Sequence, residues 1–126
     1  MGIRKGLTPH HVGRLSEYIV RLWYQVRGYR VRASNWRMRG GELDLVLTKH
    51  SQIVFVEVRA RRGRGLVSAL DSFHHQKRYY FERCALHYLH RHGLLAEHAR
   101  MDFAAVTWVG LRPHVDVISN VSRFDD

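Results

Sequence analysis

The sequence predicts an α/β domain in which a central mixed β-sheet is flanked by helices. Three observations predict it: a helical repeat near the N-terminus, two alternating apolar and polar runs that form a hairpin, and a second helical repeat followed by two more alternating runs. The order helix, three strands, helix, strand, strand is typical of layered α/β folds. No repeat, low-complexity tract or linker divides the chain, so we expect a single domain over residues 1–126 with a core of about 10–119.

The first helix is expected from about Thr8 to Arg27, followed by Gly28 as a C-terminal stop. Its apolar residues recur at helical spacing, and the stripe expected to face the core comprises Leu15, Ile19, Leu22, Trp23 and Val26. Glu17 then lies roughly opposite this stripe and by default faces solvent. Val20 and Tyr24 flank Glu17, which indicates that this side is also partly covered.

A strand is expected from Tyr29 to Trp36, with a turn at Gly40-Gly41 after it, and the hairpin that follows is the most informative part of the chain. Residues 42–48 and 53–59 alternate apolar and polar side chains on either side of a short polar loop. Centring that loop between His50 and Ser51 sets the pairing register. One continuous apolar face then comprises Leu43, Leu45, Leu47, Val54, Val56 and Val58.

On the other face of this hairpin, Asp44 is directly opposite Glu57, and Glu42 is opposite Arg59. Opposed side chains have Cβ atoms roughly 4.5–5.5 Å apart, so the two acids repel each other. A cation between them removes that repulsion, and two carboxylates suit Mg²⁺ or Mn²⁺, which polarises a phosphodiester and lowers the pKa of a bound water. The alternative is a solvated hairpin end in which each acid pairs with a nearby arginine.

The second half of the chain continues the α/β pattern. A basic loop, Arg61-Arg62-Gly63-Arg64-Gly65, leads to a second helix that Asp71 or Ser72 caps and that ends near His92. The apolar stripe of this helix comprises Phe73, Tyr80, Phe81, Cys84 and Tyr88. Two further strands are expected at Met101–Val109 and His114–Ile118.

Composition excludes several classes of protein. Apolar residues make up 45% of the chain, enough for a core, and no run approaches the roughly 18 apolar residues that a membrane span needs. No apolar segment follows the first charged residues, so we expect neither a secretory signal nor a membrane partner. Cys84 is the only cysteine, which excludes a disulfide scaffold and favours the cytoplasm.

The net charge of +10, from 21 basic and 11 acidic residues, indicates an anionic partner. Arginine dominates the basic residues, and its guanidinium binds phosphate bidentately. Residues 1–41 are the most strongly basic part of the chain. Nucleic acid is the commonest partner of such a domain, although ribosomal contacts or an anionic membrane exploit the same field.

Three further charged residues have both a functional and a structural interpretation. Arg59 lies on the same strand face as Glu57 and suits a grip on a scissile phosphate, or else an ion pair with Glu42; it stays protonated and does not readily act as a base. Lys77 falls within the apolar stripe of the second helix, where burial suits proton transfer, or where its ammonium group reaches out to water. Asp102 is either a site residue or part of a structural ion pair.

Other signals are weaker. Trp36 and Tyr29 lie among arginines and either stack on unpaired bases or belong to the core. A zinc site would draw on histidines whose spacing matches ligand geometry only in part, so contacts with solvent or phosphate are favoured for His74, His75, His87, His90 and His92.

The chain carries Gly41-Glu42-Leu43-Asp44-Leu45-Val46, Val54-Phe55-Val56-Glu57-Val58-Arg59, Lys77 and Arg100-Met101-Asp102-Phe103 in this order. Together these segments resemble the YraN-like family of predicted bacterial endonucleases. That family is related to the archaeal Holliday-junction resolvases and belongs to the PD-(D/E)XK, or restriction-endonuclease-like, nucleases. The similarity runs from about Gly13 to Ser119, nearly the whole chain.

The resemblance implies a restriction-endonuclease-like three-layer fold and a cofactor of Mg²⁺ or Mn²⁺. It implies that Asp44 and Glu57 are catalytic metal ligands, joined by Glu17 of the first helix. Arg59 stands where the PD-(D/E)XK pattern usually has lysine, although YraN-like members often carry arginine, and Ser16 replaces a usual glycine. Lys77 corresponds to a lysine of the second helix. With arginine at position 59, either Lys77 takes over the role of general base, or a metal-bound hydroxide needs no base, or the protein binds without cutting.

We therefore expect a metal-dependent endonuclease for structured or branched DNA. Backbone phosphates would be held by the arginines of two segments, Arg37, Arg39, Arg61, Arg62 and Arg64. The rival interpretation is a catalytically silent DNA- or RNA-binding accessory protein on a nuclease scaffold. A third is an oligomeric module whose basic face binds acidic protein. The resemblance also implies a homodimer, because resolvase-like enzymes that cut two strands symmetrically usually act as dimers.

Overall fold

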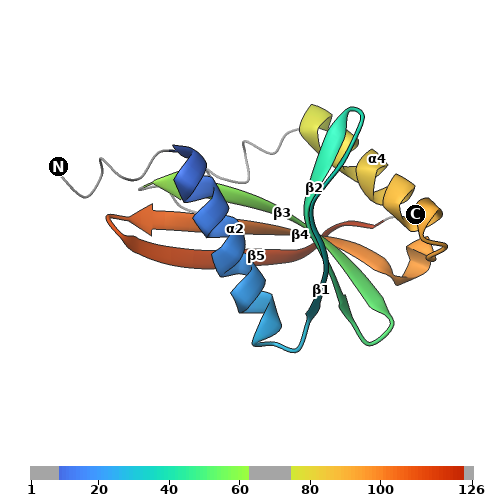
Figure 1. The fold of residues 1–126 in the computed structure, drawn as a ribbon, viewed down its shortest axis with the longest axis horizontal. Helices are drawn as coiled ribbons and strands as arrows, with labels where there is room; N and C mark the ends of the chain where they lie inside the picture. The colour runs from blue at the N-terminus through green and yellow to red at the C-terminus, as the bar shows by residue number, and fades with distance from the viewer. Residues whose placement is uncertain (1–8, 63–74, 124–126) are drawn as a thin grey trace.

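A computed structural model describes residues 9–62 and 75–123 and shows a five-stranded sheet between two helices (Figure 1). The helices and strands are α2 (Pro9–Gln25), β1 (Arg30–Met38), β2 (Gly41–Lys49), β3 (Gln52–Arg62), α4 (His75–Arg91), β4 (Ala99–Val109) and β5 (Arg112–Arg123), with a short 3₁₀ turn at Ala96–His98. This order confirms the predicted one. The last strand is longer than the alternation indicated.

The sheet is mixed, as predicted. Its strands lie in the order β1-β2-β3-β4-β5, and every neighbouring pair is antiparallel except β3 and β4. The parallel pair follows from the connection, because the chain between β3 and β4 carries α4 and returns to the end of the sheet from which β3 started. Alternate side chains of β3 enter two different cores, Phe55 that of α4 and Val54 that of α2. The two helices therefore cover opposite faces and complete a three-layer α/β fold.

The core beneath α2 corrects the predicted helix face. The buried residues are Val12, Ser16, Val20 and Tyr24, at a spacing of four. Leu15, Leu22 and Val26, expected in the core, are 40%, 41% and 78% exposed. Ser16 decides the difference, because its hydroxyl donates to the Val12 carbonyl (2.7 Å) and accepts from Trp108 Nε1 (3.0 Å), so a polar residue is satisfied inside the core. Glu17 consequently lies beside the buried face rather than opposite it.

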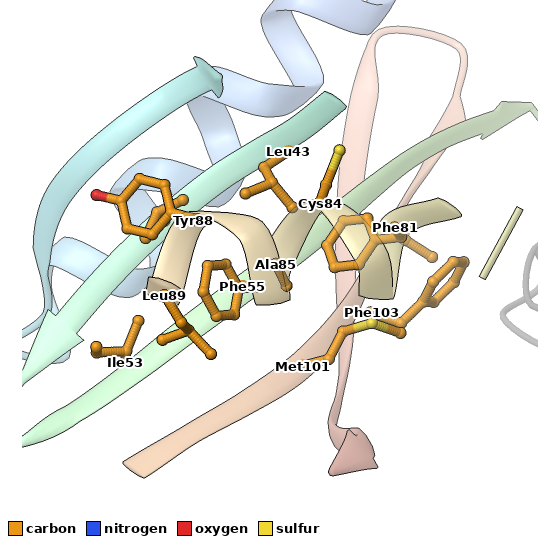
Figure 2. Close-up of a cluster of buried hydrophobic side chains, with 12 residues drawn as sticks. Leu43, Ile53, Phe55, Phe81, Cys84, Ala85, Tyr88, Leu89, Met101 and Phe103 are labelled. Atoms are coloured by element: carbon orange, nitrogen blue, oxygen red, sulfur yellow. The ribbon is translucent and has the colours of Figure 1, made fainter. Parts of the chain in front are cut away.

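The core beneath α4 joins the helix to β2, β3 and β4, as Figure 2 shows. Phe81, Cys84 and Tyr88 are buried there as predicted, together with Ala85 and Leu89 of the same helix. Tyr80 is a correction, since it is 43% exposed. Asp71, Ser72 and Phe73, which sequence analysis placed at the start of this helix, lie outside the described residues.

The predicted hairpin register is confirmed from Lys49↔Gln52 to Leu45↔Val56. The continuous apolar face is wrong in one respect: Leu45 packs beneath α2, whereas Leu43 packs beneath α4. The alternation breaks at Asp44, beside Asn35 of β1, which has a left-handed φ of 51°. The same irregularity occurs in β1, where Ala33 and Trp36 face the same core although they are three residues apart. In both strands, therefore, the side chains beyond this point lie on the opposite face from the one that regular alternation predicts.

Asp102 lies in the centre of the sheet, fully buried, and proves to be structural. Its carboxylate accepts hydrogen bonds from Tyr24 Oη (2.6 Å), Arg100 Nε (2.9 Å) and the Asn120 amide (2.9 Å). Such a buried charge persists only when its partners are in place. Of the two interpretations of Asp102, the ion pair holds.

Within the described part of the chain, no helix is long and apolar enough to cross a membrane.

Candidate active site

A cavity of about 350 Å³ opens where β2 and β3 diverge beneath the first turns of α4. Both of the predicted hairpin acids line it. The lining residues are Gly40, Gly41, Glu42, Asp44, Glu57, Val58, Arg59, Tyr80 and Phe81. The same cavity thus holds two carboxylates and an arginine that sequence analysis assigned to one site.

Asp44 is held in place by the backbone of the neighbouring strand. The Val58 amide donates to Asp44 Oδ2 at 2.8 Å, a bond that takes the place of the next rung of the β2–β3 ladder. Burial and the charge of Glu57 raise the pKa of Asp44 well above its usual range, while the Val58 bond opposes the rise. A hydrogen bond between the two carboxyl groups adds to the rise, so the pair is stable only when one acid holds a proton or a positive charge lies between them.

Glu57 is 6% exposed and forms an ion pair with Arg59, two residues along the same strand. Arg59 Nε lies 3.3 Å from Glu57 Oε2, but the geometry is not that of a hydrogen bond. Sequence analysis paired Arg59 with Glu42; that pairing is wrong, because Glu42 forms its ion pair with Arg37 (3.5 Å). The break at Asp44 explains the difference, since it ends the regular ladder before Glu42.

Glu17 lies in a neighbouring cavity of about 190 Å³, which is lined by Arg14, Glu17, Tyr18, Arg21, Ser34, Asn35 and Leu45. Asn35 connects the two cavities. With its amide nitrogen facing the acids, it donates to Glu17 Oε1 (3.2 Å) and Glu42 Oε2 (3.3 Å). Burial raises the pKa of Glu17 to about 7, and the charge of Asp44 adds to the rise. Glu17 is therefore electrostatically coupled to Asp44 while facing a different hollow.

The donor set fits a divalent cation that takes most of its ligands from elsewhere. Mg²⁺ is commonly bound through one or two carboxylates, with waters and substrate phosphates completing its shell, and Asp44 with Glu57 is such a pair. No three histidine, cysteine, aspartate or glutamate side chains within residues 9–62 and 75–123 are close enough to hold a metal by themselves. Glu17 as a third ligand therefore stays a prediction. The described histidines His87, His90 and His92 form no zinc site, and the side chains of His74 and His75 lie outside the described part of the structure.

Four of the five predicted phosphate-binding arginines are close in sequence to residues that line the cavity. Arg37 and Arg39 are exposed at the β1–β2 turn, next to Gly40. Arg61 and Arg62 are the last residues of β3, beyond Arg59. Arg64 lies outside the described residues.

Three other candidates are placed as follows. Lys77 belongs to the first turn of α4, four residues before Phe81, and its side chain lies outside the described part of the structure. Trp36 packs against the α4 core, edge-on to Tyr88 at 5.2 Å. Tyr29 is half-buried and its hydroxyl accepts from Arg100 Nη2 (2.9 Å). Both aromatic residues therefore belong to the core rather than to a base-stacking surface.

Two features of the site escape periodicity. Tyr80 lines the cavity, although its helical spacing suggested the core. Residue 41 has no room for a side chain, because a Cβ at this position would lie 2.6 Å from Cys84 Sγ and 3.4 Å from the Tyr80 carbonyl oxygen. The Gly40-Gly41 pair was readable as a turn, but its contact with α4 depends on tertiary packing.

Comparison with known proteins places the chain in a family. The model of the uncharacterised protein family UPF0102 matches residues 16–106, which span every residue of the cavity. A UPF0102 protein of Alkaliphilus metalliredigens (strain QYMF) is 33% identical over 86% of this chain and 95% of its own length. UPF0102 proteins of Nitratidesulfovibrio vulgaris (strain DP4) and Ectopseudomonas mendocina (strain ymp) are 37% and 38% identical, over 80% and 82% of this chain and 75% and 89% of their own. The chain belongs to the UPF0102 family, which is the YraN-like family that its motifs resemble.

Proposed function

We propose that this protein is an endonuclease that hydrolyses phosphodiester bonds in structured or branched DNA with Mg²⁺ or Mn²⁺ as cofactor. The observation that carries the proposal is the pair of acids, Glu57 buried and Asp44 half-buried, at the wall of an open cavity in a chain of net charge +10. A repulsive pair of this kind destabilises the fold, and a bound cation offsets the repulsion. We also propose that the protein acts in the cytoplasm.

Each residue then has a separate task. Asp44 and Glu57 hold the cation, and the Val58 amide keeps the Asp44 carboxylate aimed into the cavity. A divalent cation there would supply Lewis-acid polarisation of the phosphodiester and a lowered pKa of the attacking water. Arg59 binds the scissile phosphate and stabilises the charge that develops on it. Lys77 is the candidate for the proton-transfer group, and Glu17 supports the site through its charge.

The test is cleavage of end-labelled four-way and Y-shaped DNA, compared with linear duplex, in Mg²⁺, Mn²⁺ or EDTA. We expect metal-dependent cutting that Asp44→Asn and Glu57→Gln abolish while DNA binding stays equal or tightens, because a negative charge is removed. Glu97→Gln is the matched control, since Glu97 is an exposed acid of the 3₁₀ turn outside the cavity. Cutting by Asp44→Asn at the wild-type rate would exclude the proposed site.

A second candidate function is nucleic-acid binding without catalysis. Arg59 favours it, because an arginine at this position stays protonated and does not accept a proton. Both functions predict binding that weakens steeply with salt, so salt dependence does not separate them. An isothermal titration of Mn²⁺ does: heat that the wild type shows and the Asp44→Ala, Glu57→Ala double variant lacks supports the metal site and the nuclease. Equal traces, with DNA present, favour the silent binding protein.

A further inference from the structure

The cavity has two walls of different chemistry. One wall is charged and comes from the hairpin, with Glu42, Asp44, Glu57 and Arg59. The other wall is apolar and aromatic, with the Gly40-Gly41 turn and two aromatic residues of α4, Tyr80 and Phe81. A hydrated cation makes no favourable contact with the second wall, since metals and their waters bind polar ligands.

The volume also exceeds what a hydrated cation needs. Six water-sized ligands at roughly 30 Å³ each fill about half of the cavity. The whole volume lies at the lower end of the range for pockets that bind small organic molecules. An organic group of about the size of one nucleotide is therefore a better match than a cation alone.

Tyr80 is the residue that offers a stacking surface in this cavity. Phe81 is 3% exposed and points into the core toward Met101 and Phe103, which anchors this turn of α4 (Figure 2). Tyr80, the residue before Phe81 on the helix, is 43% exposed and lines the cavity. The close approach of Gly41 to the Tyr80 carbonyl and to Cys84 sets the distance between Tyr80 and the hairpin acids. The aromatic ring is thus carried on a well-anchored turn.

Arg59 supplies an independent sign of a missing ligand. Its Nε is buried and lies 3.3 Å from Glu57 Oε2 as an ion pair, but the geometry is not that of a hydrogen bond and no described group accepts one from it. A buried donor without an acceptor is uncommon in folded proteins, and a phosphate oxygen is the acceptor that a guanidinium binds best. A phosphate at Arg59 would lie at the charged wall, with the sugar and base of the same nucleotide directed toward Tyr80.

We propose that the cavity binds one unpaired nucleotide of the substrate strand, with its base stacked on Tyr80 and its phosphate at Arg59. This rests on the proposed function and specifies the class of substrate. A base inside an intact duplex is stacked on both sides and does not enter such a pocket without leaving the helix, whereas a base at a bulge, flap or branch is already unstacked. The protein therefore selects DNA with an unpaired nucleotide over intact duplex.

The test measures binding rather than cleavage, so that it is separate from the test of the nuclease. Fluorescence anisotropy in Ca²⁺ compares a linear duplex with the same duplex carrying one unpaired thymidine. We expect the bulged DNA to bind at least about 5-fold more tightly, and Tyr80→Ala to remove that preference through a loss of about 5- to 150-fold on the bulged DNA alone. Tyr80→Phe retains the preference, because it keeps the aromatic face.

The control is an exposed tyrosine that does not contact Tyr80. Tyr79 is unsuitable because its ring lies edge-on to that of Tyr80 at 5.6 Å, so Tyr18→Ala takes its place. Tyr18 of α2 is 53% exposed and lines the neighbouring cavity rather than this one, so its loss should leave both affinities unchanged. Equal affinity of the wild type for the two DNAs, no binding to either, or an equal loss on both DNAs in Tyr80→Ala would overturn the inference. A Tyr80-dependent preference without cleavage in Mg²⁺ or Mn²⁺ would instead refute the nuclease and leave this site standing.

Discussion

The backbone amide of Val58 on β3 donates a 2.8 Å hydrogen bond to the Asp44 carboxylate on β2. The regular β2–β3 ladder stops at Leu45 and Val56, so a side chain replaces the backbone as acceptor where the two strands separate. The cavity begins where the strands separate, and this bond fixes the Asp44 carboxylate at its wall. It stabilises Asp44 against the repulsion from Glu57 but does not remove that repulsion.

Asp44→Asn should therefore stabilise the metal-free protein. Asparagine keeps an oxygen that accepts from Val58 and loses the charge that opposes Glu57. A relief of about 1 kcal/mol corresponds to a rise in Tm of roughly 3–6 °C for a domain of this length. Thermal unfolding at alkaline pH in EDTA measures it. Added Mn²⁺ should raise the Tm of the wild type and leave that of Asp44→Asn unchanged, and an equal rise in both would show that the cation binds elsewhere.

Glu17 should make stability depend on pH. Its pKa of about 7 in the folded protein lies above the ordinary value of 4.5, so the folded state binds a proton that the unfolded state has released between these two values. Stability from this group is therefore fully present below about pH 4.5 and is lost as the pH rises through 7. Glu17→Gln should make the fall of the Tm over this range less steep and raise the Tm at alkaline pH, while the raised pKa of Asp44 accounts for the slope that remains. A profile that keeps its slope in Glu17→Gln would assign the pH dependence to another group.

The strand pairing is predictable from the sequence because the short loop at His50 and Ser51 fixes which residues of the two strands face each other. Both faces of these strands are buried between Leu45 and Val56, so loop length sets the register more firmly than alternation does. The acid pair follows from that register. The left-handed Asn35 and the turning-over of β2 at Asp44 do not follow, since alternation carries no signal for a single irregular residue.

The face of α2 is not predictable for a different reason. The helix carries large apolar residues on two sides, and the side that packs contains Ser16. A serine lowers the apparent hydrophobicity of that side, whereas in the fold its hydroxyl is fully satisfied by Val12 and Trp108. Trp108 lies 92 residues away, so the contact that decides the helix orientation is invisible to local periodicity.

Asp102 should matter for stability and not for the site. Tyr24→Phe removes the hydroxyl that donates to Asp102 Oδ2 at 2.6 Å, and the loss of a buried hydrogen bond to a charged group should cost about 1.5–3 kcal/mol in the free energy of unfolding. Urea denaturation measures this cost. Tyr18→Phe, at a residue that is 53% exposed, should change it by less than about 0.5 kcal/mol. Mn²⁺ affinity should be unchanged in both variants, and a weakened affinity in Tyr24→Phe would connect this network to the cavity.

Gly41 and Cys84 should be coupled through packing. A Cβ on residue 41 would lie 2.6 Å from Cys84 Sγ, closer than two such atoms approach in folded proteins, so Gly41→Ala should cost about 1–3 kcal/mol in the free energy of unfolding. Cys84→Ala alone should also destabilise, because it leaves a small cavity in the α4 core. In the double variant the methyl group of residue 41 occupies the space that the sulfur vacates. The double variant should therefore lose less free energy of unfolding than the two single variants lose together, by about 0.5 kcal/mol or more, which is the size of coupling found between side chains in contact. Urea denaturation of the four proteins completes the cycle. Strict additivity would mean that the Tyr80 carbonyl, at 3.4 Å, rather than Cys84 limits the space at residue 41.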